Sequence, residues 1–165
     1  MSPTLPLPAP VSVETPPIRI QRRRTAGFRL QAQSPDGRPV VSVCRPGKWG
    51  NEFRVEAEDG RYFVVDANRV PWGSDDGYAN RAEAAAYAVK LYGGGWLEGK
   101  VHSGQLDLTE LRGKHLACFC KIVDECGNCV PCHADVLLSL SNGLTLDEIK
   151  HENLKNYARQ QGATP

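Results

Sequence analysis

The sequence has almost no net charge and no long apolar segment, and each absence excludes a class of protein. Lys and Arg total 20 and Asp and Glu total 19, so the formal net charge is +1. A chain this balanced has no strong overall field to attract nucleic acid or an anionic membrane surface. It also lacks a run of about 18 apolar residues, so no membrane-spanning helix is expected.

The N-terminus lacks the basic head and apolar core of a secretory signal. We therefore expect a cytoplasmic protein, in which thiols stay reduced and disulfides are disfavoured. Residues 1–17 are rich in proline and poor in large side chains, so they are expected to form a disordered tail, and residues 161–165 a disordered end. Residues 18–160 remain, which is enough chain for a single domain with its own core.

Apolar alternation predicts several short strands. Residues 18–20 and 38–44 have the period of strands, and residues 114–120 place Leu116, Cys118 and Cys120 on one face. Residues 53–65 read as a hairpin, because Asp59 and Gly60 form a favoured two-residue turn.

Helical periodicity separates these strands. The helix expected over 81–92 begins after Asn80 as N-cap and stops at the glycines 93–95. A short helix over 106–113 and a C-terminal pair over 133–143 and 145–160 follow. Strands interleaved with helices predict an α/β fold: a small mixed β-sheet flanked by helices, with a zinc-stapled loop before the C-terminal helix pair.

Cysteine is concentrated in one segment, "CFCKIVDECGNCVPCH", which spans 118–133 and holds five of the six cysteines. A C-x2-C turn lets two sulfurs approach one tetrahedral ion, and four thiolates, or three and an imidazole, complete a closed zinc site. Because these ligands would tie down a segment with few apolar residues, zinc would also order residues 121–131. The spacing favours four ligands and leaves two alternates, Cys118 and His133; the favoured four are Cys120, Cys126, Cys129 and Cys132.

Other uses of these thiols stay open at this point. Cys126, Cys129 and Cys132 repeat the C-x2-C-x2-C spacing of some iron–sulfur proteins. "CGNC" has the form of a redox motif, although it does not open a helix of the expected kind. Cys132 precedes a predicted helix, whose N-terminus would lower its pKa and suit a nucleophile beside His133. Reduced thiols without any ligand are the remaining alternative.

The loop "RPGKWGNEF" and the residue after it form the candidate ligand-binding surface. Its glycines permit close backbone approach, its cations suit a phosphate, and an indole can stack on a base. The same composition is typical of an exposed turn anchored by one tryptophan. The candidate ligand-binding residues are Arg45, Lys48, Trp49, Asn51 and Arg54.

Four segments in this order, "RIQRRRTAGFRL", "VSVCRPGKWGNEF", "LRGKHLACFC" and "CHADVLLSLSNG", resemble a family of small phage and bacterial proteins known as domain of unknown function 4326. The resemblance covers roughly residues 18–142. It implies a small α/β architecture and a phage or mobile-element context, so the cytoplasm would be that of the host cell. The family pattern matches Arg45, Trp49, Gly50, Asn51, Phe53, Cys118, Cys120, Cys132 and His133.

The chain departs from that pattern at three places. Cys44 stands where glycine is usual, Glu52 replaces a proline, and Cys126 and Cys129 lie in a segment that is commonly shorter. The resemblance thus implies shared chemistry at Cys118, Cys120, Cys132 and His133, whereas spacing favours the ligand set that includes Cys126 and Cys129.

Together these features predict a phage-type, zinc-binding α/β protein that binds or modifies a nucleotide or nucleic acid. Both the ligand loop and the helix at Cys132 follow predicted strands, and ligand sites in α/β sheets favour the carboxyl ends of strands. The alternative is a non-catalytic, zinc-stapled module that binds a host factor or nucleic acid. Its support is the lack of a recognisable general base near the cysteines, since Asp135 is the nearest acid.

Overall fold

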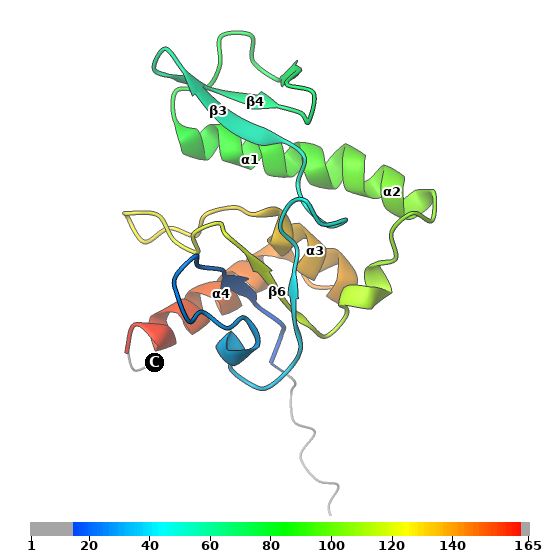
Figure 1. Ribbon diagram of the computed structural model, residues 1–165, viewed down its shortest axis with the longest axis vertical. Coiled ribbons are helices and arrows are strands. Elements are labelled where there is room, and N and C mark those ends of the chain that lie inside the picture. Colours follow the sequence, from blue (N-terminus) through cyan, green and yellow to red (C-terminus); the bar gives the residue numbers. More distant parts are fainter. Residues whose placement is uncertain (1–14, 163–165) are drawn as a thin grey trace, which may run out of the picture.

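A computed structural model describes residues 15–162 (Figure 1), and the predicted tail and end lie mostly outside this range. Most of the strands lie in the first half of the sequence and most of the helices in the second half, where one strand, β6, lies between helices. The elements are β1 (Arg19–Gln21), η1 (Gln31–Gln33), β2 (Val40–Ser42), β3 (Arg54–Glu58), β4 (Arg61–Val65), β5 (Pro71–Trp72), α1 (Arg81–Leu91), η2 (Tyr92–Leu97), α2 (Glu98–His102), η3 (Leu108–Leu111), β6 (His115–Cys118), α3 (His133–Asn142) and α4 (Leu146–Gln160).

The α/β class is confirmed, but the strands form two sheets in place of one mixed sheet. One sheet is parallel, with β6 between β1 and β2, and Leu116 is level with both Arg19 and Val41. The other is antiparallel, in the order β3-β4-β5. The parallel strands are joined by long connections, whereas β3 and β4 meet through a two-residue turn. Asp59 and Gly60 occupy that turn with φ of 48° and 76°, as the sequence predicted.

The helices begin where the sequence indicates. Asn80 caps α1 by accepting from the Glu83 N–H, and Thr145 and Glu148 form a capping box at α4. The predicted stop of the first helix at the glycines 93–95 is wrong. The chain continues through them as the π-helical segment η2 and then as α2. Tyr92 and Leu97, both fully buried, hold this segment against the core in spite of its glycines.

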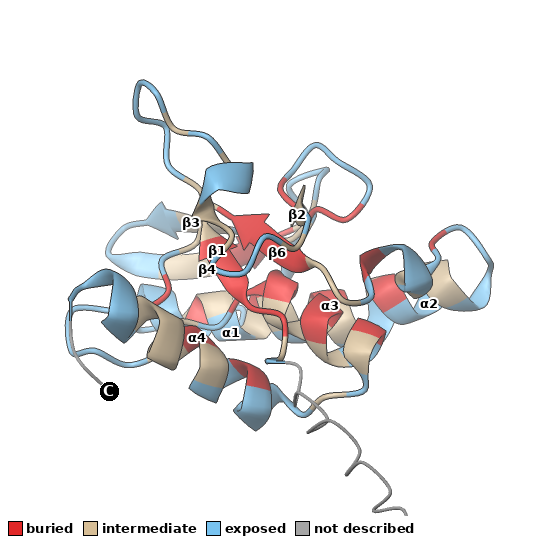
Figure 2. Cartoon of the chain, turned by 90° about the horizontal axis from the view of Figure 1, so that it is seen from below, coloured by how far each residue is buried: buried red, intermediate tan, exposed pale blue. Residues whose placement is uncertain are grey.

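The core lies between the parallel sheet and the helices (Figures 1 and 2). Helix α3 packs on β6 and β1, and α4 packs on α3. Burial is densest along β6, whose four residues are all buried. A separate cluster joins Val64 of β4 to Ala84 and Ala88 of α1, which unites the hairpin with that helix.

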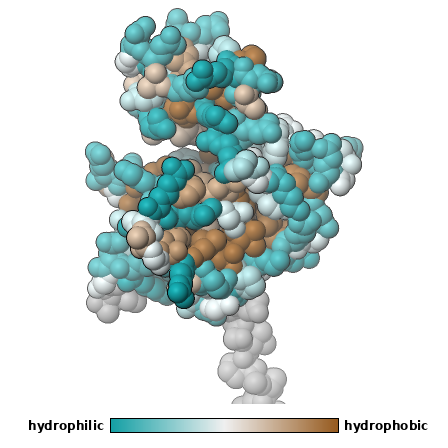
Figure 3. Space-filling model, viewed as in Figure 1, coloured by the Kyte–Doolittle hydropathy of each residue, from teal (hydrophilic) through white to brown (hydrophobic). Residues whose placement is uncertain are grey.

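The molecular surface in Figure 3 is mostly hydrophilic over the hairpin end, with apolar residues gathered lower on the same face. Among residues 15–162, no helix combines the length and apolar character needed to cross a membrane. Each of the six cysteines is a free thiol.

Candidate metal centre and adjoining cationic cleft

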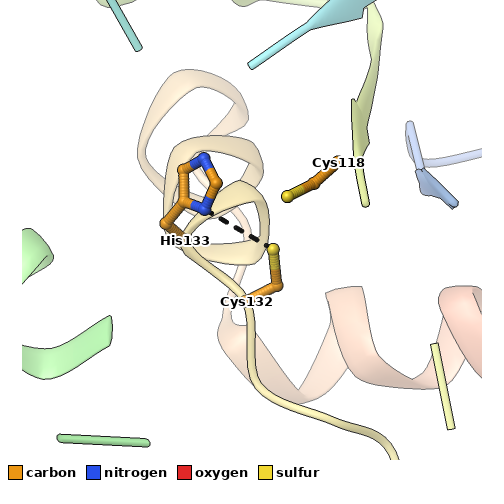
Figure 4. Close-up of side chains that lie close together, drawn as sticks. All are labelled: Cys118, Cys132 and His133. Carbon is orange, nitrogen blue, oxygen red and sulfur yellow. Dashed lines mark hydrogen bonds between the residues drawn. The ribbon is translucent and has the colours of Figure 1, made fainter. Parts of the chain in front are cut away.

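Three buried side chains meet where the strand β6 ends and the helix α3 begins (Figure 4). Cys118 is the last residue of β6, Cys132 is the N-cap of α3, and His133 is the first residue of that helix. One ligand atom from each lies within 4.8 Å of the other two, so the three could hold a metal ion. Their exposure is 6%, 1% and 6%, which places the group inside the protein.

A hydrogen bond from His133 to the backbone fixes which ring nitrogen faces the sulfurs. Its Nε2 lies 2.7 Å from the Val43 carbonyl oxygen, which can only accept, so Nε2 carries the proton. In the neutral ring Nδ1 then has a free lone pair, and it lies 3.6 Å from the Cys132 Sγ. Histidines that ligate metals typically donate their other ring N–H to a carbonyl or carboxylate in this way.

Cys120 supplies a fourth donor beside this group. Its Sγ lies 3.6 Å from that of Cys118. In a tetrahedral zinc site, bond lengths of about 2.3 Å to sulfur and 2.0–2.1 Å to nitrogen place two sulfurs about 3.8 Å apart and a sulfur and a nitrogen about 3.6 Å apart. The Cys118–Cys120 and Cys132–His133 distances match two of the six edges of such a tetrahedron. The Cys120 Sγ lies outside the group whose ligand atoms are all within 4.8 Å of one another, and the donor types present are among those that zinc takes.

The group also concentrates charge. The hydrogen bond with Cys120 raises the pKa of the Cys118 thiol, but hydrogen bonds with Cys132 and Cys44 outweigh it and lower that pKa to about 5. Burial lowers the pKa of His133, whereas the Cys118 and Cys132 sulfurs raise it well above its usual value. The low pKa of Cys118 favours the thiolate form that binds metals, and a bound metal ion would take the place of the proton that these sulfurs favour on the His133 ring.

The remaining residues of the four-cysteine set favoured by spacing lie in the segment before α3. Cys126 is exposed and Cys129 is partly buried. Within the described range, neither belongs to a group of three or more ligands that lie this close together. The structure thus brings Cys132 of that set into the cluster with both alternates, Cys118 and His133, and places Cys120 beside it through its contact with Cys118.

Hydrogen bonds and burial within the protein order residues 121–131. The Asp124 carboxylate accepts hydrogen bonds from the Cys126 and Asn128 N–H groups, both at 2.9 Å, which closes the turn around Gly127. Ile122 is buried at 6% exposure. The sequence predicts that zinc orders this segment, and these contacts within the protein contribute to its order as well.

Arg19 of β1 contacts both ends of the segment 121–131, a role that the sequence pattern did not predict. It lies between Ile18 and Ile20, and their alternation predicted a solvent-facing side chain, yet Arg19 is 1% exposed. Its guanidinium donates to the carbonyls of Lys121 and Val130 and to the Asp135 carboxylate, at 3.0, 2.6 and 3.0 Å. Asp135 also accepts from Asn153 and from the Cys132 N–H. Arg19 thereby joins β1, the segment 121–131 and the start of α3.

A cationic cleft lies next to the residues that contact the metal group. Val43 and Cys44, at the carboxyl end of β2, contact His133 and the Ala117 carbonyl, and the chain then enters the cleft at Arg45. The cleft has a volume of about 410 Å³. Four of its lining residues carry positive charge, Arg45, Lys48, Arg54 and Lys100, and one, Glu52, carries negative charge.

The other predicted ligand residues shape this loop from within. Trp49 is buried at 4% exposure and its carbonyl accepts from the Tyr92 hydroxyl at 2.7 Å. Asn51 accepts from the Phe53 N–H and donates to the Ala88 carbonyl. Trp49 therefore anchors the loop and does not stack on a ligand. The indole that lines the cleft is that of Trp96, which is not among the ligand-binding residues predicted from the sequence. Its position directly after the glycines 93–95 was the one signal in the sequence that could have marked it as a binding residue.

Gly50 allows the loop to fold back on itself. A Cβ at this position would lie 2.9 Å from the Arg45 N and Cα, which are backbone atoms that cannot move aside cheaply. We expect Gly50→Ala to lower the free energy of unfolding by about 1–3 kcal/mol through overpacking, measured by urea unfolding.

The matched control is Gly99→Ala in α2, where an added Cβ meets nothing within 4 Å. This change should stabilise by about 0.5–1 kcal/mol, because glycine weakens a helix relative to alanine. Equal effects of the two substitutions would show that the close approach at Gly50 is unimportant.

A comparison with known protein families found one family that matches most of the chain. The family described as "Domain of unknown function (DUF4326)" matches residues 20–143. The chain belongs to this family. The match spans both β2 with its following loop and the whole of the Cys/His group, as the resemblance of the motifs indicated. Searches of curated proteins and of solved structures found no match.

Proposed function

We propose that this protein holds a structural zinc ion and binds a phosphate-bearing ligand, a nucleotide or nucleic acid, in the cleft beside it. The observation that carries the proposal is the convergence of four cationic side chains on one cleft. Its loop follows Val43, whose carbonyl contacts His133 of the metal group. In this proposal Cys118, Cys120, Cys132 and His133 are the zinc ligands. A phage-type protein in the host cytoplasm is the matching context, since reduced thiols persist there.

The donor set supports zinc over an iron–sulfur cluster. Three thiolates and one imidazole form a common tetrahedral zinc set, whereas the cluster spacing would need Cys126, which is exposed. Burial of the group supports a structural role. Catalytic zinc keeps one position open to water, and here Cys118, Cys132 and His133 are at most 6% exposed.

The cleft supports binding of phosphate. Guanidinium and ammonium groups bind phosphate oxygens through charge-assisted hydrogen bonds. Burial lowers the pKa of Arg45, and the positive charge of Arg54 nearby lowers it further. Two cations held near one another are stabilised when an anion binds, and the cleft holds four cations against the single acid Glu52.

A binding role is better supported than a modifying one. A general base would need a free carboxylate or imidazole within reach of the ligand. Near the cysteines, Asp135 is engaged by Arg19 and Asn153, and the His133 Nε2 is engaged by Val43. Glu52 is the one carboxylate that lines the cleft, and it lies there among four cations, which favour its charged form over a proton-carrying one. This observation also favours the non-catalytic module as the second candidate, with the cleft as its binding surface.

Two measurements on the full chain test the proposal. Elemental analysis of native protein should give one zinc per chain. Calorimetry with nucleotides and short oligonucleotides should find a ligand whose affinity falls about tenfold in Arg45→Ala and falls further with added salt. Arg159→Ala, which removes an exposed arginine outside the cleft, should bind as the parent does. Protein with zinc that binds none of these ligands would leave only the metal part of the proposal.

A further inference from the structure

The cations of the cleft come from three parts of the chain and include two with no competing partner. Arg45 and Lys48 lie on the loop after β2, Arg54 begins β3, and Lys100 lies on α2. Lys48 pairs with Glu110, and Lys100 donates to Gln105. Within residues 15–162, the guanidiniums of Arg45 and Arg54 make no hydrogen bond or ion pair. The cleft thus presents spare donors from two segments, the loop after β2 and the start of β3.

The size of the cleft suits a small ligand better than a polymer. About 410 Å³ lies within the usual range of 300–1,000 Å³ for small-molecule sites. Single-stranded nucleic acid is bound along an extended positive groove with a series of stacking aromatic residues. A net charge of +1 does not favour such a groove.

The aromatic residue of the cleft is already covered. The Trp96 ring stacks on Tyr92, with 5.1 Å between the ring centroids and 23° between the planes. The Lys100 Nζ lies 5.6 Å from the Trp96 centroid. Trp49 is buried in the core. A base entering the cleft would therefore have to displace Lys100 from Trp96, whereas phosphate oxygens can bind Lys100 where it is.

We infer that the cleft recognises the phosphate chain of a nucleoside di- or triphosphate, and that the base stays outside it. This inference rests on the proposed function and narrows it to a free nucleotide bound without base selectivity. A chain of two or three phosphates carries several anionic oxygens, and Arg45, Arg54 and Lys100 line one cleft from three segments of the chain. Each cation then contacts an anionic oxygen, as in other charge-assisted sites.

Calorimetry on the full, zinc-loaded chain tests the inference with probes that separate phosphate from base. Inorganic tripolyphosphate, ATP, GTP and CTP should bind within about threefold of one another. AMP should bind at least tenfold more weakly than ATP, and adenosine should not bind. The single acid in the cleft adds a test of opposite sign: Arg54→Ala should weaken tripolyphosphate about tenfold, whereas Glu52→Gln should tighten it by about threefold.

The alternative outcomes are distinct. Binding of one nucleotide at least tenfold more tightly than the others and than tripolyphosphate would overturn the inference and leave the proposed function standing. Affinity that rises with oligonucleotide length, without binding of tripolyphosphate, would do the same in favour of nucleic acid. No binding of any phosphate compound would overturn the inference and the ligand-binding part of the proposed function. A folded Arg54→Ala protein, checked by circular dichroism, that binds tripolyphosphate as the parent does would place the ligand elsewhere.

Discussion

Replacing Cys118 by serine should abolish stoichiometric zinc and lower the free energy of unfolding by several kcal/mol. Serine has nearly the shape of cysteine but does not supply a thiolate, so the loss reports on the metal bond. Structural zinc binds with about 10–16 kcal/mol in small zinc domains, and that energy is part of the folding energy. Elemental analysis and urea unfolding of the purified variant measure the two effects.

Cys126→Ser is the matched control, because it removes an exposed thiol from the same segment. It should keep a full equivalent of zinc and the stability of the parent protein. The reverse pattern, with zinc lost in Cys126→Ser and retained in Cys118→Ser, would show that the ligand set favoured by spacing is correct. It would also show that the segment 121–131 moves onto the metal when the ion binds.

Arg19→Met should destabilise the protein by about 3–5 kcal/mol, measured by urea unfolding. Methionine keeps much of the aliphatic length of arginine but removes the charge. The substitution leaves the Asp135 carboxylate without its ion pair and the Lys121 and Val130 carbonyls without donors. Removing one member of a buried ion pair typically costs this much, since the other charge stays buried and uncompensated.

Two further variants separate this effect from loss of packing. Arg19→Met combined with Asp135→Asn should recover part of the stability, because no charge is left unpaired and asparagine can still accept from the Cys132 N–H. Arg69→Met breaks a pair with Glu56 in which the Arg69 side chain is 81% exposed, and it should change stability by less than about 1 kcal/mol. A loss of similarly small size in Arg19→Met would contradict the structural role of Arg19.

Local signals in the sequence predicted most of the elements, and tertiary contacts account for the exceptions. The Asp59-Gly60 turn and the caps at Asn80 and Thr145 act within a few residues, so a single sequence is enough to predict them. The glycines 93–95 gave a strong local stop signal, yet burial of Tyr92 and Leu97 keeps the chain helical there. How strands are shared between two sheets depends on long connections and was not predictable from period alone.

The candidate site shows the same division. Sequence spacing found the cysteine-rich segment, but spacing treats the chain as a line and favoured Cys126, which lies close to Cys129 and Cys132 in sequence. Cys118 approaches Cys132 only because β6 ends beside the start of α3. Arg19 is distant in sequence from Lys121, Val130 and Asp135, which it contacts. Lys100 is likewise distant from the loop after β2 with which it lines the cleft. Their roles depend on which elements pack together, which no local pattern records.

The buried apolar residues form three clusters, and the separation of two of them affects how the molecule can open. The hairpin and α1 share one cluster around Val64, and the larger cluster holds the parallel sheet, η2 and α3; Phe53 packs against both. Such units can open separately, each with its own free energy. The cleft draws Arg54 from the hairpin unit and Lys100 from α2, which follows η2. An anion held between them would act as a cross-link, and the hairpin would then open only after the ligand had left.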